Sequence, residues 1–108
     1  MSHYMIQFAY TAQTWAALQA NPTDRTAGLN ALADKLGCRL ISFYYHFGEY
    51  DGVFIFEAPD DTTANALVMA TTAPGHIKST RTTRLFTASE TVAAMRKAQG
   101  ADYEGPRR

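Results

Sequence analysis

Residues 47–61 read Phe-Gly-Glu-Tyr-Asp-Gly-Val-Phe-Ile-Phe-Glu-Ala-Pro-Asp-Asp, a turn, a strand and a helix start in direct succession. Gly48 and Gly52 permit positive φ at both ends of the turn, which predicts a hairpin. Residues 53–57 are almost wholly apolar, as expected of a central strand that is covered on both faces. Pro59 ends this strand, and the aspartate pair that follows can cap a helix.

Other stretches of the chain alternate with period two or show helical spacing. Residues 3–10 alternate between two faces, and residues 39–47 are rich in aromatic and β-branched side chains. The pair Asn21-Pro22 interrupts the first helical stretch, which predicts one broken helix or a lead-in turn before a helix. Strands are therefore predicted over residues 3–10, 39–47, 53–57 and 77–86, and helices over residues 11–18 and 23–36 and from positions 61 and 87 onward.

The order of these elements, β-α-β-β-α-β with an extra C-terminal helix, predicts an α+β fold of the ferredoxin-like type. Both helical connections are long enough for right-handed crossovers, so the first and third strands should be central and the other two should form the edges. A chain of 108 residues has room for one domain. We assign residues 1–100 to this domain and residues 101–108 to a polar tail.

The composition is that of a soluble globular protein, with 46% hydrophobic residues and a formal net charge of zero. A neutral chain does not attract polyanions, so neither nucleic acid nor a membrane is predicted as a partner. Cys38 is the sole cysteine, which excludes an intrachain disulfide and predicts a small core residue in a reducing compartment. Because no signal peptide and no run of about 20 apolar residues is visible, a cytoplasmic protein is predicted.

The predicted sheet is apolar on both faces, although helices can cover only one of them. On the second strand, strict alternation places Ile41, Phe43, Tyr45 and Phe47 on one face and Leu40, Tyr44 and His46 on the other. An uncovered apolar face marks an interface or a binding groove. We therefore predict a homodimer, or a higher homo-oligomer, whose sheets meet face to face and enclose a cavity between the sheets or at its mouth. Because Gln7 is polar, the side of the first strand that carries it is predicted to face the pocket or the partner.

The motif Gly-Glu-Tyr-Asp at residues 48–51 resembles the GYD-domain family, which is named for its Gly-x-Tyr-Asp pattern. The flanking features are similar to that family and come in the same order: a Lys-Leu-Gly helix end, an aromatic strand, and Glu-Ala-Pro-Asp-Asp at residues 57–61. The resemblance covers about residues 4 to 90. It implies a ferredoxin-like, dimeric α/β-barrel protein of bacterial type, in a family whose activity is largely unassigned.

A more distant resemblance combines the same motif with Pro-Gly-His-Ile-x-x-Thr at residues 74–80. This pattern is similar to the effector-binding module of Lrp/AsnC regulators. The resemblance implies a ferredoxin-like dimer that binds small metabolites, often amino acids, near subunit interfaces. No helix-turn-helix precedes the motif, so the resemblance does not imply DNA binding.

A two-faced apolar sheet that carries a few polar side chains is the usual make-up of a ligand pocket. The sequence thus predicts a small-molecule-binding homodimer that uses no cofactor. His3, His46 and His76 lie on different elements, so no metal site is predicted. The polar side chains predicted to bind the ligand are Gln7, Tyr44, His46, Tyr50, Asp51 and Arg81.

Two other functions remain open at this point, and no catalytic residue is assigned. Dimeric α/β barrels include cofactor-independent monooxygenases, isomerases and haem enzymes, and His46 with Tyr44 or Asp51 could move protons on a bound substrate. That hypothesis rests on analogy between folds. Alternatively, the apolar face could serve assembly alone. Asp51 also has a structural interpretation, in which its carboxylate accepts hydrogen bonds from turn amides.

Overall fold

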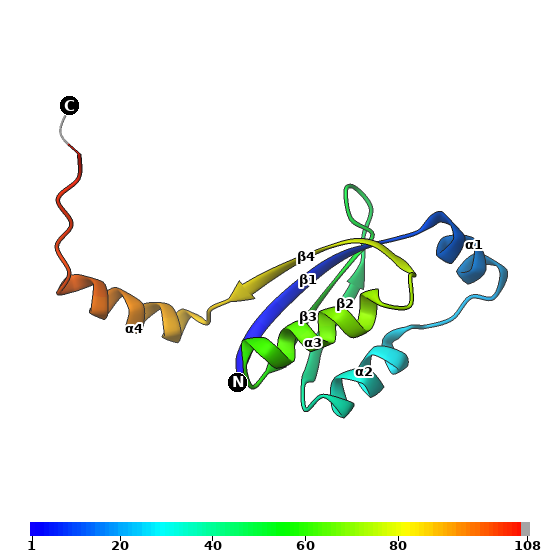
Figure 1. Ribbon diagram of the computed structural model, residues 1–108, viewed down its shortest axis with the longest axis horizontal. Helices are drawn as coiled ribbons and strands as arrows, with labels where there is room; N and C mark the ends of the chain where they lie inside the picture. The colour runs from blue at the N-terminus through cyan, green and yellow to red at the C-terminus, as the bar shows by residue number, and fades with distance from the viewer. Residues whose placement is uncertain (107–108) are drawn as a thin grey trace.

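The computed structural model describes residues 1–106 and has one four-stranded antiparallel sheet with helices on one face (Figure 1). The strand order is β2-β3-β1-β4, so the first and third strands are central, as predicted. The ferredoxin-like α+β fold with an extra C-terminal helix is confirmed. The elements are β1 (Ser2–Tyr10), α1 (Ala12–Ala20), α2 (Thr26–Lys35), β2 (Arg39–Tyr45), β3 (Gly52–Ala58), α3 (Asp61–Thr72), β4 (Ile77–Leu85) and α4 (Ala88–Gln99).

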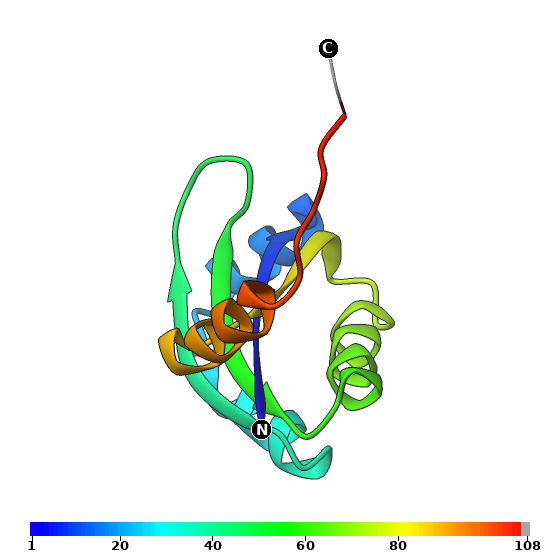
Figure 2. The same ribbon diagram turned by 90° about the vertical axis from the view of Figure 1, so that its left-hand side faces the viewer.

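The two faces of the sheet differ in what covers them. On β1, Tyr4, Ile6 and Phe8 are buried in one core with Ala33 of α2 and Leu67 of α3, and we call this side the helix-covered face. Figure 2 shows α3 and the sheet as separate layers. The opposite side, which we call the open face, has no helix on it within residues 1–106. It carries half-buried side chains from the two central strands: Met5, Gln7, Val53 and Ile55.

The core is built from side chains that almost no solvent reaches. Phe56, Ile6 and Leu67 are at most 1% exposed, and each contributes about 2 kcal/mol through the burial of its apolar surface. Cys38 is 6% exposed, so the sequence correctly predicts a small core residue at this position. Burial also raises the pKa of the Cys38 thiol, which disfavours the reactive thiolate.

Side chains at the predicted positions cap three helices. The Thr11 hydroxyl accepts a hydrogen bond in the first turn of α1, and Asp60 does the same for α3. Thr87 and Glu90 form the predicted capping box on α4. The segment before Gly37 is two separate helices, and the second begins at residue 26 rather than at residue 23.

In the turn between β2 and β3, only one of the two glycines has the positive φ that the sequence predicts. Gly48 has a positive φ of 126°, as predicted. Gly52 does not: it is the buried first residue of β3, and the Phe8 ring lies directly against its Cα. A Cβ on Gly52 would come within 2.7 Å of Phe8 Cε1 and closer still to Cζ. The second glycine is therefore required by a close approach of side chain to backbone, not by a left-handed conformation.

A β-bulge in β2 corrects the predicted faces of that strand. The register shifts at Ile41, so Leu40 and Phe43 both lie on the helix-covered face, opposite Phe56 and Phe54 of β3. The strand also ends at Tyr45, two residues earlier than predicted. Side chains do not alternate strictly between the two faces here, because the extra residue of a bulge shifts the residues that follow it to the opposite face.

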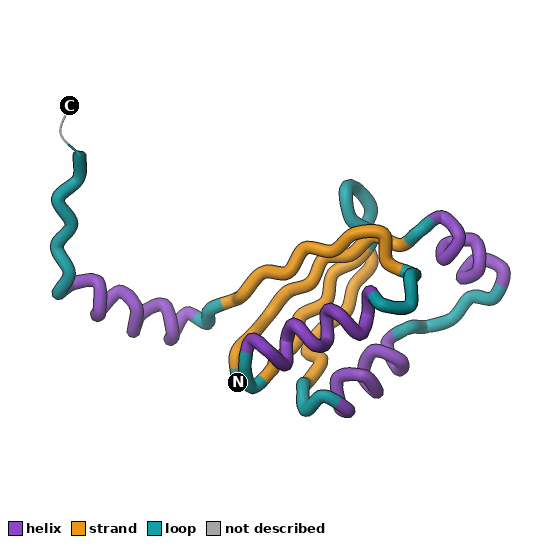
Figure 3. Tube along the Cα trace, viewed as in Figure 1, coloured by secondary structure: helices purple, strands orange, loops and turns teal. Residues whose placement is uncertain are grey.

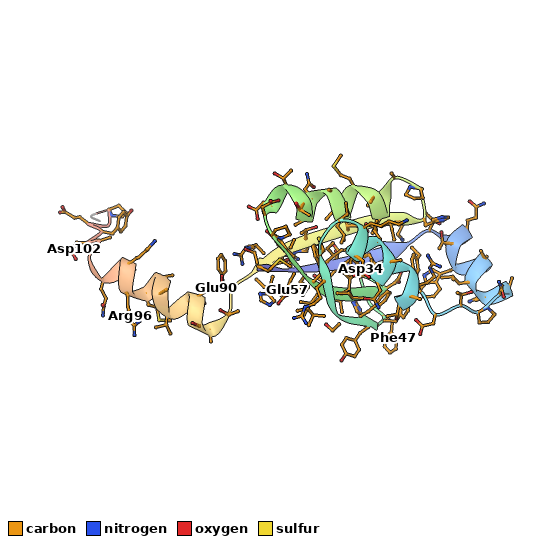
Figure 4. The ribbon with its side chains drawn as sticks, turned by 90° about the horizontal axis from the view of Figure 1, so that it is seen from below. Asp34, Phe47, Glu57, Glu90, Arg96 and Asp102 are labelled. Carbon is orange, nitrogen blue, oxygen red and sulfur yellow. The ribbon has the colours of Figure 1, made fainter. Side chains whose placement is uncertain are left out.

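The C-terminal helix α4 projects away from the rest of the molecule (Figure 3). It has no buried residue. In Figure 4, Glu90, Arg96 and Asp102 lie along this projecting segment, apart from the body that carries Asp34 and Glu57. The radius of gyration is 17.8 Å, against about 13 Å for a compact domain of this length. None of the helices described is long and apolar enough to cross a membrane.

Candidate functional site

A cavity of about 730 Å³ lies between the helix-covered face of the sheet and helices α1, α2 and α3. The strands supply its floor and the helices its walls. Aliphatic side chains of α1 and α2 line it beside the floor, and small residues of α3 line the opposite wall. Examples are Leu18 and Ala17 of α1, Leu29 and Leu32 of α2, and Ala70 and Thr71 of α3.

Aromatic rings from three adjacent strands contribute to the floor of this cavity. Phe8, Phe43 and Phe54 come from β1, β2 and β3. Their ring centroids lie 5.8 Å apart for Phe8 and Phe43, and 6.1 Å apart for Phe8 and Phe54. The contacting rings make the floor a continuous apolar surface. It suits the hydrophobic body of a ligand.

Polar groups of the cavity come mainly from the start of α1 and the loop before β4. The backbone N–H of Thr11 donates to the His76 carbonyl oxygen at 3.1 Å, and the Thr14 hydroxyl donates to the same oxygen at 3.2 Å. These bonds fasten the loop to α1. All three residues line the cavity, together with Arg25 at the start of α2.

A hydrogen-bonded cluster lies beside the cavity and includes Tyr10, which lines it. The Asp51 carboxylate accepts from the backbone N–H of Tyr10 at 2.9 Å and from Trp15 Nε1 at 3.1 Å. The hydroxyls of Tyr10 and Tyr45 lie 3.0 Å apart, and burial followed by this hydrogen bond raises the pKa of Tyr10 well above its ordinary value. Asp51 thereby joins the β2–β3 hairpin to β1 and α1. Within residues 1–106, its carboxylate makes no hydrogen bond to the turn amides, which the structural interpretation predicts as its partners.

We expect Asp51→Ala to destabilise the fold by about 2 kcal/mol, because two N–H donors lose a charged acceptor. Asp51→Asn keeps one acceptor oxygen and should cost less. Urea unfolding measures the loss, and a red shift of Trp15 emission should accompany it. If Asp51→Ala unfolds at the same urea concentration as the wild type, the carboxylate does not hold the hairpin in place.

Three of the six predicted ligand-binding residues lie in one row across the open face. Gln7 of β1 pairs with Arg81 of β4 and with Val53 of β3, and Val53 pairs in turn with Tyr44 of β2. The structure therefore brings Gln7, Tyr44 and Arg81 onto a single surface. Gln7 does lie on the side away from the helices, and Tyr44 is 67% exposed there.

The other three predicted residues lie around the β2–β3 hairpin. His46 and Tyr50 belong to the loop, and the His46 backbone N–H donates to the Asp51 carbonyl oxygen at 2.8 Å. His46 Nδ1 lies 3.4 Å from the Phe47 carbonyl oxygen. Within residues 1–106, no side-chain hydrogen bond joins His46 to Tyr44 or to Asp51. The six residues are thus divided between the open face and the hairpin, and none of them lines the cavity.

An ion-pair network lies at one end of the open face. The Glu57 carboxylate contacts His3 Nε2 at 3.1 Å and Arg39 Nε at 3.1 Å. The hydrogen bond from Arg39 holds the pKa of Glu57 below its usual range. Among the residues described, no group of three or more His, Cys, Asp or Glu side chains is arranged to hold a metal ion.

Sequence reasoning missed the residues that line the cavity. It treated Phe8, Phe43 and Phe54 as strand residues and did not single out Arg25. One signal was available, since Gly28 stands inside a predicted helix, where glycine costs about 1 kcal/mol relative to alanine. A glycine in that setting indicates close packing or function.

Comparison with known proteins agrees with this architecture. The family model for the GYD domain matches residues 4–95. No curated protein matches the chain. Among solved structures, the chain is similar to FFRP-DM1, with 16% identity, a TM-score of 0.50, and coverage of 80% of this chain and 100% of that one.

Two further solved structures are similar to the chain. MtbAldR is 11% identical with a TM-score of 0.57, over 80% of this chain and 53% of that one. A Thermus thermophilus protein, TTHA0845, is 17% identical with a TM-score of 0.53, over 82% of this chain and 96% of that one. At such identities the similarity shows the fold alone, and these neighbours are Lrp/AsnC-like and ferredoxin-like proteins.

Proposed function

Because this chain belongs to the GYD-domain family, we propose that it is a homodimer in which each protomer binds a small, largely apolar molecule between its sheet and its helices. The observation that carries the proposal is the cavity of about 730 Å³. Ligand pockets in proteins typically enclose about 300–1,000 Å³, with apolar walls and a few polar groups. The aromatic floor and the polar groups at the start of α1 match that description.

The exposed surface of the chain supports the proposed homodimer. The accessible surface is 7755 Å², whereas a compact monomer of this mass exposes about 5,900 Å². The difference of about 1,800 Å² exceeds the roughly 800 Å² that each partner buries in a standard interface. A second copy of the chain is the partner we propose, since a two-fold axis brings the same open face of each protomer together.

Helix α4 contributes to this exposed surface and gives a more specific reason to propose a partner. It has 12 residues, and an isolated helix of that length is marginal in water. Its apolar side chains are exposed, with Val92 at 42% and Met95 at 60%. Packing of α4 against the second protomer would bury this stripe. Gln7, Tyr44 and Arg81 on the open face would then face the partner.

We propose binding rather than catalysis because, within residues 1–106, no contact supports the proton-transfer pairs of His46 that the sequence suggests. His46 is exposed and has no side-chain hydrogen bond to Tyr44 or Asp51 within residues 1–106. Binding in the cavity, by contrast, requires only the burial of an apolar ligand. A pure assembly module would not need a cavity of this size.

Binding in the cavity can be tested with a neutral fluorescent probe, 4-(1-pyrenyl)butanamide. We expect Ala17→Phe to weaken its binding at least tenfold, because Ala17 lines the cavity and a phenyl ring there would occupy the space of the ligand. A tenfold loss of affinity corresponds to a loss of about 1.4 kcal/mol of binding free energy. Titration by pyrene fluorescence gives the affinity of each variant.

The matched control is Ala16→Phe, on the same helix but outside the cavity wall. Both alanines are exposed, so neither substitution disturbs the core. The control should bind the amide as the wild type does. Equal affinity for all three proteins would place the probe elsewhere and contradict the proposed function.

A further inference from the structure

The wall of the cavity carries one permanent charge, and that charge is positive. Arg25 is the sole Lys, Arg, Asp or Glu among the described residues that line the cavity. The other titratable side chains there are Tyr10 and His76. Because the whole chain has a formal net charge of zero, the imbalance is a local feature of this site.

The Arg25 guanidinium lies over the wall of the cavity. A Cβ built on Gly28 would be 3.1 Å from Nη2 of Arg25, so the guanidinium rests on the bare backbone of the glycine. Its positive charge also acts on the Tyr10 phenol, where it opposes the rise in pKa. Gly28 and Tyr10 both line the cavity. Arg25 is an exposed residue, and these observations place its charged group beside the cavity.

Arg25 has no acidic partner within residues 1–106: the structure gives its side chain neither an ion pair nor a hydrogen bond. The adjacent carboxylate, Asp24, accepts instead from the Thr26 backbone N–H at 2.9 Å. Arg25 precedes α2 without capping it through its side chain. A guanidinium with five donors therefore stands free at an apolar cavity.

We propose that the cavity selects amphipathic anions, with the hydrophobic body on the aromatic floor and a carboxylate paired with Arg25. This inference rests on the proposed function and names the ligand class of the same site. A guanidinium matches a carboxylate in geometry and can bind both oxygens. The absence of Asp and Glu from the described lining leaves no competing acceptor of that charge.

The test compares two fluorescent probes of the same shape, 4-(1-pyrenyl)butyrate and its primary amide. The wild type should bind the acid about tenfold more tightly than the amide, as expected of a hydrogen-bonded charge pair in a partly solvated site. Arg25→Gln should reduce this preference to about onefold, mainly by weakening the binding of the acid. Arg25→Lys keeps the charge and should keep part of the preference.

Lys35→Gln is the matched control, because Lys35 is an exposed cation at the C-terminal end of α2 and does not line the cavity. It removes the same charge from the chain and should retain the tenfold preference. If the wild type binds the amide but shows no preference for the acid, the ligand class is wrong and the binding function stands. A preference that survives Arg25→Gln also overturns the inference. If neither probe binds, the proposed function fails with it.

Discussion

Gly52→Ala should destabilise the protein by about 3 kcal/mol, because the new methyl group would overlap the ring of Phe8. Both residues are buried and belong to the central strands β1 and β3, so neither can move aside cheaply. Gly52 does not have a positive φ, so the loss is steric and not conformational. Urea unfolding at a fixed protein concentration measures it.

A double-mutant cycle with Phe8→Leu separates this overlap from a general intolerance of the turn. Removing the ring should relieve the clash, so the double variant should be more stable than the sum of the two single losses predicts, by at least about 1 kcal/mol. Gly100→Ala is the control, since a Cβ there would meet no atom closer than 3.9 Å and φ is −89°. Additive losses would show that Phe8 is not what requires the glycine.

Ile55→Lys should convert the proposed dimer into a folded monomer. Ile55 lies on the open face of β3 and pairs with Met5 of β1, at the middle of the sheet. An ammonium group there would be buried without a partner in a face-to-face dimer, at a cost of several kcal/mol. That corresponds to a dissociation constant on the order of a thousandfold higher.

Sedimentation velocity at micromolar concentration measures the mass of each variant. Thr62→Lys, on an exposed position of α3, adds the same charge outside the open face and should leave the dimer intact. Far-UV circular dichroism should show both variants folded, because the hydrophobic core lies within a single protomer. A dimer that survives Ile55→Lys would mean that the open face is not the interface.

Most of the fold could be predicted because the sequence signals for each helix and strand agree with the order of these elements in the fold. Thr11, Asp60 and Thr87 start helices at the predicted positions. The bulge at Ile41 could not be predicted, because a bulge depends on how two strands pair. The pattern of apolar residues along a single strand does not show it. For the same reason, the close approach of Phe8 to Gly52 is visible only after β1 and β3 pair.

The candidate site was harder to predict than the fold. The sequence draws attention to polar residues in and around strands, and three of these, Gln7, Tyr44 and Arg81, do share a face. The cavity arises instead where α1, α2 and α3 leave space above the sheet, and helix spacing is a tertiary property. The role that we propose for Arg25 depends on that space.

The most direct test of the proposed ligand-binding homodimer is native mass spectrometry of the wild type with 4-(1-pyrenyl)butanamide. One spectrum reports both the number of chains and the number of bound probes. We predict a dimer that carries two probe molecules, one in the cavity of each protomer. A monomer, or a dimer that takes up no probe, would contradict the account.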